Sequence, residues 1–271
     1  MKAHTFRCNN LNLNFLDYGT EGKRPLLFLH GGSAHAHWWD LVASRLVADY
    51  HALALDQRGH GDSDWSTDWA YGTRHYVSDL HELVSSWGFG PPVLIGHSMG
   101  AHNAMAYAAR YGKTLRGVVM IDAVADYPPA AVDYLRTLAD RPAAKFASLA
   151  DACAKFRLLP RETLASAEVL ANVARHTFKP TADGSWMHKL DRRTMIREMI
   201  QGFAELPNIT CPALIVKITN SPALPRSVAH RMAAAIPNAR VAEIADSYHH
   251  VMLDNPNALV ATLREFVESV G

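Results

Sequence analysis

The sequence predicts an α/β protein, in which a mostly parallel, doubly wound sheet carries helices on both faces. Short apolar runs alternate with segments of helical apolar spacing over the first 125 residues, and the alternation resumes after residue 206. Between one such run and one such helix lies a serine flanked by glycines. Repeated strand–helix units favour parallel strands, and the ligands of such sheets bind at the carboxyl ends of the strands.

The first strands follow from local patterns. Residues 6–8 and 11–17 are expected to form a hairpin, because the turn-prone pair Asn9–Asn10 separates them and the second segment alternates apolar and polar residues. Residues 26–29 and 52–55 are uninterrupted apolar runs. Such runs are typical of central parallel strands that are buried on both faces.

Helices and further strands alternate along the next part of the chain. Residues 38–47 and 76–87 have apolar side chains at helical spacing. The short apolar run 91–95 predicts a strand that leads into an Ala-rich helix over residues 101–110. Another strand is expected over residues 118–121, directly before an aspartate.

Residues 126–206 have a different pattern, which predicts a mobile helical cap. Helical segments are interrupted by prolines, and no strand is expected there. The α/β core then comprises residues 1–125 and 207–271. Its second part is expected to contain strands at residues 213–216 and 240–244 and helices at residues 227–236 and 256–270.

Charge and length restrict the class of partner. The chain has 271 residues, and its 27 basic residues nearly balance its 26 acidic ones. This balance argues against binding to nucleic acid or to an anionic membrane. We expect a monomer or homodimer that acts on a small, largely uncharged molecule.

Cellular location and cofactors are predicted from what the sequence lacks. The N-terminal residues have no apolar stretch typical of a secretory signal, and no run is long enough to span a membrane. A cytoplasmic protein is expected. Cys8, Cys153 and Cys211 are far apart and odd in number, which argues against disulfides and against a zinc site. No metal and no cofactor are expected.

The pentapeptide Gly96-His97-Ser98-Met99-Gly100 is the strongest functional motif. It lies between a predicted strand and a predicted helix, which is the context of a nucleophile elbow, G-x-S-x-G. The glycines allow a sharp bend that leaves Ser98 exposed at the helix N-terminus. A glycine-bounded turn with an incidental serine is the alternative.

The chain resembles the α/β-hydrolase family over nearly its whole length. The matching stretches, in the order usual for the family, are residues 26–39, 56–63, 93–100, 118–122 and 241–256. The resemblance implies an eight-stranded sheet with the cap after strand six, and a Ser-His-acid triad. The sequence looks most like relatives that hydrolyse enamides, lactones or vinylogous diketones in ring-degradation pathways.

A serine hydroxyl needs a neighbouring imidazole to accept its proton. His249 is the expected base, because it follows the last predicted strand and precedes the final helix. The family usually has glycine before this histidine, whereas this chain has Tyr248. The adjacent His250 is therefore the alternative. His97 is expected to pack beneath the elbow.

The position of the triad acid differs from the commonest pattern in the family. Many relatives carry it in the loop that here comprises residues 219–224, which contain no carboxylate. Some relatives place it where this chain has Asp122, which we expect to be the triad acid. The alternative is that Asp122, at the end of its strand, only accepts hydrogen bonds from loop amides. Asp246 is the second candidate, although it lies very close to His249 in sequence.

Backbone N–H groups are expected to stabilise the oxyanion. Met99 follows the nucleophile and supplies the first N–H. By resemblance Gly32 supplies the second, and Ser33 is the alternative to Gly32. Ser33, Trp38, Tyr127 and Trp186 are candidates for substrate binding.

A serine nucleophile, a histidine base and an oxyanion hole specify acyl transfer to water. The expected function is hydrolysis of a small carboxylic ester, lactone or activated amide. The alternatives are a C–C bond hydrolase of vinylogous diketones, a cofactor-free oxygenase on the same fold, and a ligand receptor with a vestigial triad.

Overall fold

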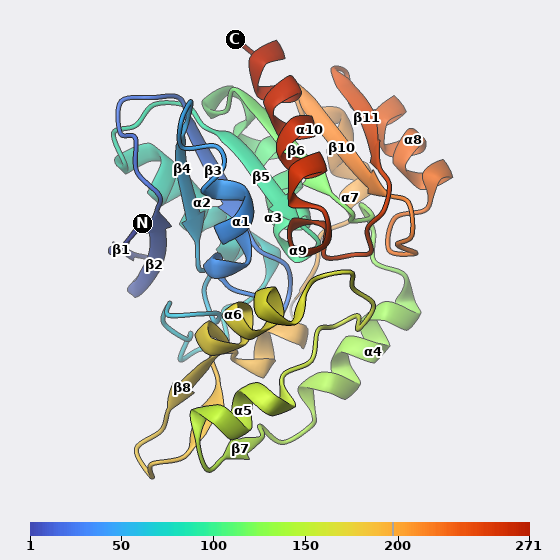
Figure 1. The fold of residues 1–271 in the computed structure, drawn as a ribbon. Helices are drawn as coiled ribbons and strands as arrows, with labels where there is room; N and C mark the ends of the chain where they lie inside the picture. Colours follow the sequence, from blue (N-terminus) through green and yellow to red (C-terminus); the bar gives the residue numbers. More distant parts are fainter. Residues whose placement is uncertain (197) are drawn as a thin grey trace.

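The computed structural model describes residues 1–196 and 198–271 (Figure 1). Its centre is an eight-stranded sheet in the order β1-β2-β4-β3-β5-β6-β10-β11. The strands are β1 (Lys2–Cys8), β2 (Leu11–Asp17), β3 (Pro25–Leu29), β4 (His51–Leu55), β5 (Val93–His97), β6 (Gly117–Ile121), β10 (Ala213–Ile218) and β11 (Ala239–Ile244). All neighbouring strands from β4 to β11 are parallel, whereas β1 and β2 are antiparallel to their neighbours. The predicted fold class is confirmed.

Helices cover both faces of this sheet, and a separate apolar cluster fills each interface. The main helices are α2 (Thr73–Ser86), α3 (Met99–Tyr111), α8 (Arg226–Ala235) and α10 (Pro256–Ser269), and the short ones are η1 (Ala36–Trp39), α1 (Asp40–Ala43), η2 (Gly112–Thr114), α7 (Gly202–Glu205), η4 (Leu206–Asn208) and α9 (Val251–Asp254). The first cluster joins α2, α3 and α8 to side chains such as Leu94, and the second joins α1, α9 and α10 to Val93 and Ile95. Successive residues of β5 therefore point to opposite layers.

The N-terminal hairpin is confirmed, but its first strand is longer than expected. β1 begins at Lys2 and pairs with β2 from Lys2 opposite Asp17 to Cys8 opposite Leu11. The extra residues are largely exposed and polar, so they carry no apolar signal. Asn9 and Asn10 have φ angles of 45° and 63°, which a tight hairpin turn requires.

The helix expected over residues 38–47 is shorter in the structure. Only η1 and α1 form, and α1 ends at Ala43. Beyond it, Arg45 N donates to Val42 O and Leu46 N donates to Ala43 O, at 3.1 and 3.0 Å. These bonds reach back three residues, so the chain tightens into turns although its apolar spacing suits a helix.

The segment between β6 and β10 contains helices, as expected, but also a small sheet. Before α7 and η4, its elements are α4 (Pro129–Ala139), β7 (Lys145–Phe146), α5 (Leu149–Lys155), α6 (Ala167–Thr177), β8 (Phe178–Pro180), β9 (Trp186–His188) and η3 (Arg192–Ile196). The expectation of no strand is wrong, since β7, β9 and β8 pair antiparallel. Strands of two or three residues are too short to show alternation. Figure 1 shows these elements gathered at one end of the main sheet.

The division into a core of residues 1–125 and 207–271 and a cap of residues 126–206 stays a prediction, as does the mobility of the cap. Among the described residues, no helix has both the length and the apolar character that a bilayer crossing requires.

A buried ion pair ties the loop after β4 to α2. Arg58 Nε donates to Asp79 Oδ2 at 2.6 Å, and a second guanidinium nitrogen donates to Asp79 Oδ1 at 2.5 Å. Both side chains are almost fully buried, at 4% and 3% exposure. Asn9 Nδ2 also donates to Asp79 Oδ1, at 2.8 Å. The pair therefore joins the hairpin, the loop and α2.

Replacing Arg58 should destabilise the protein strongly, because it leaves the Asp79 carboxylate buried without its cation. We expect Arg58→Met to lower the free energy of unfolding in urea by about 3–5 kcal/mol. The matched control is Arg136→Met, since Arg136 pairs with Asp133 on the surface at 65% and 70% exposure. That change should cost less than about 1 kcal/mol. Equal effects of the two changes would contradict the assignment.

Candidate active site

Ser98 lies at a tight turn between β5 and α3. Its φ of 51° and ψ of −115° are unusual for a residue with a side chain. A Cβ atom at Gly96 would lie 2.3 Å from Gly100 O, and one at Gly100 would lie 2.3 Å from Leu29 O. No side chain fits at either position, so the two glycines are required for the turn. Ser98 is thereby held at the N-terminus of α3.

Asp122 and His249 form a hydrogen-bonded pair beside this turn. Asp122 directly follows β6 and is completely buried, and its backbone N donates to Val216 O at 2.9 Å. His249 lies between β11 and α9, and its Nδ1 is 2.8 Å from Asp122 Oδ2. Because a carboxylate accepts, Nδ1 carries the proton, and the lone pair of the neutral ring is on Nε2.

The two alternative residues, Asp246 and His250, do not form the pair. Asp246 is exposed and has a φ of 50°. His250 Nε2 donates to Pro160 O at 3.0 Å. The structure therefore brings Asp122, not Asp246, to His249, and it turns His250 toward the segment after α5.

Asp254 braces the loop that carries His249. Tyr248 N donates to Asp254 Oδ2 at 2.8 Å, and Leu164 N donates to Asp254 Oδ1 at 2.9 Å. The loop is thus attached both to α9 and to the segment before α6. These contacts fix the position of His249 although Tyr248 replaces the glycine usual in related sequences.

The loop after β10 holds a cation instead of a carboxylate. Lys217 is buried at the end of β10, and its Nζ donates to the carbonyl of Ser221 at 2.9 Å and to that of Ile218. The ammonium thus pairs with backbone carbonyls at the start of the loop of residues 219–224, which contains no carboxylate. Lys217 was not singled out by the sequence analysis.

A network of buried polar groups fixes the loop after β3. His30 Nδ1 donates to Gly31 O at 2.8 Å, and His30 Nε2 accepts from Gln57 N at 3.0 Å. Gln57 Nε2 donates to His30 O at 2.8 Å, and Asn103 Nδ2 of α3 donates to Gln57 Oε1 at 2.7 Å. Burial lowers the pKa of His30, so its neutral ring can accept from Gln57. Gln57 and Asn103 were missed because their partners are distant in sequence.

Gly32 and Met99 are the expected donors of an oxyanion hole. Both line the cavity that contains Ser98. Met99 is the first residue of α3, and the first N–H groups of a helix have no acceptor within the helix. Ser33, the fallback donor, follows Gly32 with a φ of 62°.

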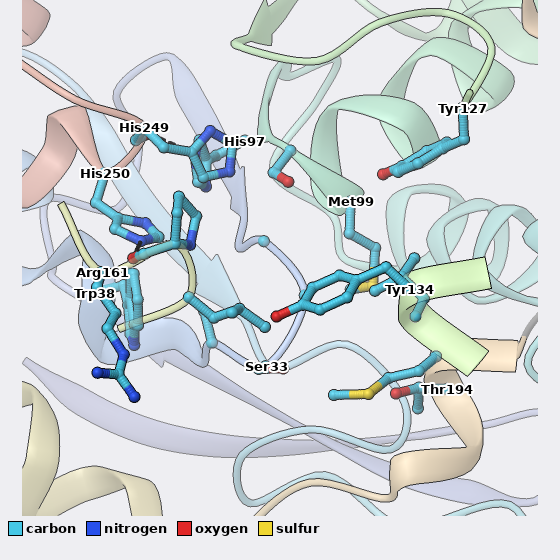
Figure 2. Close-up of a pocket in the computed structure, with 18 of the residues that line it drawn as sticks. Ser33, Trp38, His97, Met99, Tyr127, Tyr134, Arg161, Thr194, His249 and His250 are labelled. Atoms are coloured by element: carbon cyan, nitrogen blue, oxygen red, sulfur yellow. Dashed lines mark hydrogen bonds between the residues drawn. The ribbon is translucent and has the colours of Figure 1, made fainter. Parts of the chain in front are cut away.

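A cavity of about 500 Å³ opens above Ser98, and Figure 2 shows most of its side chains. The sheet side contributes Gly31, Gly32, Ser33, Ala34, Trp38, His97, Ser98, Met99, His249 and His250, and the segment after β6 contributes Tyr127, Tyr134, Leu135, Leu159, Pro160, Arg161, Glu162, Thr194 and Met195. The cavity therefore lies between the carboxyl ends of the strands and the inserted segment.

A second cavity of about 330 Å³ adjoins the first. The two share Ser98, Tyr127, Pro160 and His249, and the second is also lined by Asp122, Ala123, Val124, Pro128, Ala131, Ser221, Pro222 and Ala223. A molecule bound at Ser98 can thus extend in two directions.

Three of the four residues expected to bind substrate line the larger cavity, namely Ser33, Trp38 and Tyr127. Trp186, the fourth, is not brought to this site. It lies on β9, paired with Phe146 and Pro180, and among the described residues it lines neither cavity beside Ser98. Tyr134, Arg161 and Thr194 were missed, because no local pattern tells which cap residues face the sheet.

His97 packs beneath the elbow, as expected. Its Nε2 donates to His249 O at 2.8 Å. Burial, reinforced by the neighbouring His249 and His250, holds the pKa of His97 well below its ordinary value. Burial also lowers the pKa of His250 to about 3. Both rings are therefore neutral at physiological pH.

Residues 26–263 match the model of the Alpha/beta hydrolase family. The chain belongs to this family. Ser98, Asp122 and His249 follow three separate strands of its main sheet, β5, β6 and β11. The predicted resemblance is confirmed.

The relatives of this α/β hydrolase include a hydrolase of an amide and an esterase. It is 24% identical to the 2-(acetamidomethylene)succinate hydrolase of Mesorhizobium japonicum, over 94% of this chain and 92% of that protein. It is 25% identical to the esterase YbfF of Escherichia coli, over 90% and 92%. A crystal structure of E-2-(acetamidomethylene)succinate hydrolase shares the fold, with a TM-score of 0.86, 23% identity and coverage of 98% and 99%. The chain is thus an enzyme of the hydrolase class.

Proposed function

We propose that this enzyme is a serine hydrolase that cleaves a small carboxylic ester, lactone or activated amide through an acyl-enzyme. The observation that carries the proposal is the 2.8 Å contact of Asp122 Oδ2 with His249 Nδ1 beside the elbow serine. This contact leaves the Nε2 lone pair of His249 available as a base. In the proposal Ser98 is the nucleophile, His249 the base and Asp122 the acid of the triad.

In the first half-reaction, Ser98 Oγ attacks the carbonyl carbon while His249 Nε2 takes the hydroxyl proton. The buried Asp122 carboxylate stabilises the resulting imidazolium. The N–H groups of Gly32 and Met99 stabilise the oxyanion. His249 then gives its proton to the leaving oxygen or nitrogen, which departs and leaves an ester on Ser98.

In the second half-reaction, water replaces the leaving group. His249 Nε2 removes a proton from the water, which attacks the ester carbonyl. Collapse of the second tetrahedral intermediate returns the proton to Ser98 and releases the carboxylic acid. A resident metal or cofactor has no part in these steps.

The size and lining of the two cavities favour a small substrate. The larger cavity holds about 500 Å³ and is mostly apolar, with Arg161 and Glu162 among its polar residues. The named relatives support both an amide and an ester, since one acts on 2-(acetamidomethylene)succinate and another is an esterase. We propose that the enzyme acts in the cytoplasm, which its free Cys8, Cys153 and Cys211 favour.

Ser98→Ala should abolish covalent labelling by a fluorophosphonate, because the alanine has no oxygen to phosphonylate. Mass spectrometry of the labelled wild-type protein should place a single adduct on Ser98. The matched control is Ser33→Gly, since Ser33 lines the same cavity and its positive φ suits glycine. That variant should keep the adduct. An adduct on another residue would defeat the assignment.

Assays of the same preparations separate the alternative functions. Multiple turnover of acyl p-nitrophenyl esters or N-acyl enamines, lost in Ser98→Ala, supports the proposal. Labelling without turnover of any acyl substrate would favour a receptor with a vestigial triad. Oxygen uptake with a heteroaromatic substrate, kept in Ser98→Ala, would favour the cofactor-free oxygenase.

Asp122→Asn should reduce kcat by several orders of magnitude while leaving fold and labelling site intact. In a serine protease, removal of this charge costs about 10⁴-fold, because the histidine adopts the wrong tautomer. Asp246→Asn is the matched control and should have little effect, since Asp246 is exposed. Melting temperatures of both variants must accompany the kinetics. Retention of more than about a tenth of kcat, which is under ~1.4 kcal/mol, would exclude Asp122 as the acid.

A further inference from the structure

Three histidine rings meet beside Ser98. His97 comes from the end of β5, and His249 and His250 come from the loop before α9. One ring nitrogen from each lies within 4.8 Å of the other two. The ring centroids are 4.5, 5.1 and 6.0 Å apart. All three residues line the larger cavity (Figure 2).

Hydrogen bonds at the opposite nitrogens fix the tautomer of each ring. Nδ1 of His249 is bonded to Asp122 Oδ2, Nε2 of His97 to His249 O, and Nε2 of His250 to Pro160 O, at 2.8, 2.8 and 3.0 Å. Carbonyl and carboxylate oxygens only accept, so these nitrogens carry the protons. The lone pairs are therefore on His249 Nε2, His97 Nδ1 and His250 Nδ1. In the described part of the chain, the two Nδ1 atoms are buried without hydrogen-bond partners.

This pattern is that of histidines prepared to bind a metal ion. Histidine ligands of metals usually donate their second N–H to a carboxylate or a carbonyl, which orients the ring. Tetrahedral zinc at 2.0–2.1 Å from each nitrogen places ring centroids about 5 Å apart, close to the observed spacing. Beside His97 Nδ1 the chain has Gly31, where a Cβ would lie only 2.9 Å from that nitrogen. A side chain at position 31 would therefore cover the lone pair of His97 Nδ1.

We propose that His97, His249 and His250 form a site for a divalent transition metal ion such as Zn²⁺, and that its occupation inhibits the enzyme. Binding itself depends only on the three rings. Inhibition rests on the proposed function, because the metal would take the Nε2 lone pair with which His249 accepts the proton of Ser98. The metal and the proton compete for one electron pair, so the ion acts as a reversible inhibitor.

Direct binding is tested with Co²⁺ and chelator-treated protein, because the visible absorption of Co²⁺ reports its ligands without any activity. We expect one Co²⁺ per chain with a tetrahedral spectrum, displaced by Zn²⁺ and retained in Ser98→Ala. His97→Asn and His250→Gln should each weaken binding by at least the roughly 10–100-fold that loss of an outer-shell partner costs. Far-UV circular dichroism and melting temperature verify that both variants fold.

The matched control is His37→Gln, which disrupts a different close histidine pair. His37 stacks on His176 with ring centroids 3.5 Å apart, outside the three-histidine cluster. This variant should bind Co²⁺ like the wild type. The proposal is overturned if Co²⁺ does not bind, or if His37→Gln weakens binding while His97→Asn and His250→Gln do not.

Zinc titration of ester hydrolysis then tests inhibition. The half-inhibitory concentration should match the Kd from Zn²⁺ competition with Co²⁺, and a chelator should restore the rate. Stimulation by Zn²⁺, or unchanged hydrolysis at saturating Zn²⁺, would overturn the inhibitory role. Co²⁺ binding by a protein that hydrolyses no acyl substrate would defeat the proposed hydrolase and leave the metal site standing.

Discussion

The hydrogen bond between the Asp122 carboxylate and the His249 imidazole is the interaction on which the rest of the site depends. An isolated carboxylate that is completely buried would be very costly, and it persists only with a donor within reach. His249 supplies that donor at 2.8 Å. The same bond fixes the ring tautomer, so a single contact both pairs the buried carboxylate and places the histidine lone pair on Nε2.

The position of the acid constrains the loops around it. Asp122 follows β6, which lies among the inner strands of the sheet. The loop after β10 contributes no carboxylate to His249 and folds around the Lys217 ammonium instead. A carboxylate in that loop would have to share the surroundings of His249 with Asp122, and two like charges there would repel each other. The histidine loop must then reach across to β6. Its attachment to Asp254 holds it at that distance.

Patterns that are local in sequence predicted most of the fold and the residues that the structure brings together beside Ser98. Buried strands such as β3 and β5 have continuous apolar runs, and the elbow requires glycines that no other residue can replace. Asp122 could be predicted because the loop at residues 219–224 has no carboxylate and because related chains use that strand end. The choice of His249 as the histidine beside Asp122 also followed from the resemblance, although Tyr248, in place of the usual glycine, left His250 as an alternative.

Features that depend on distant contacts could not be predicted. The sheet formed by β7, β8 and β9 has strands of only two or three residues, too short for a periodic signal. Trp186 belongs to that sheet, and an aromatic side chain gives no sign of whether it faces a cavity or a neighbouring strand. The network from His30 through Gln57 to Asn103 joins three segments whose proximity only the folded chain reveals.

The tautomer of His249 is the most direct test of its hydrogen bond with Asp122. NMR of [¹⁵N]histidine-labelled protein, at a pH where the ring is neutral, distinguishes a protonated from an unprotonated ring nitrogen, and comparison with Asp122→Asn assigns the signals. We expect a protonated Nδ1, with its proton shifted far downfield by the carboxylate, and an unprotonated Nε2. A proton on Nε2, or His249 signals that do not change in Asp122→Asn, would contradict it.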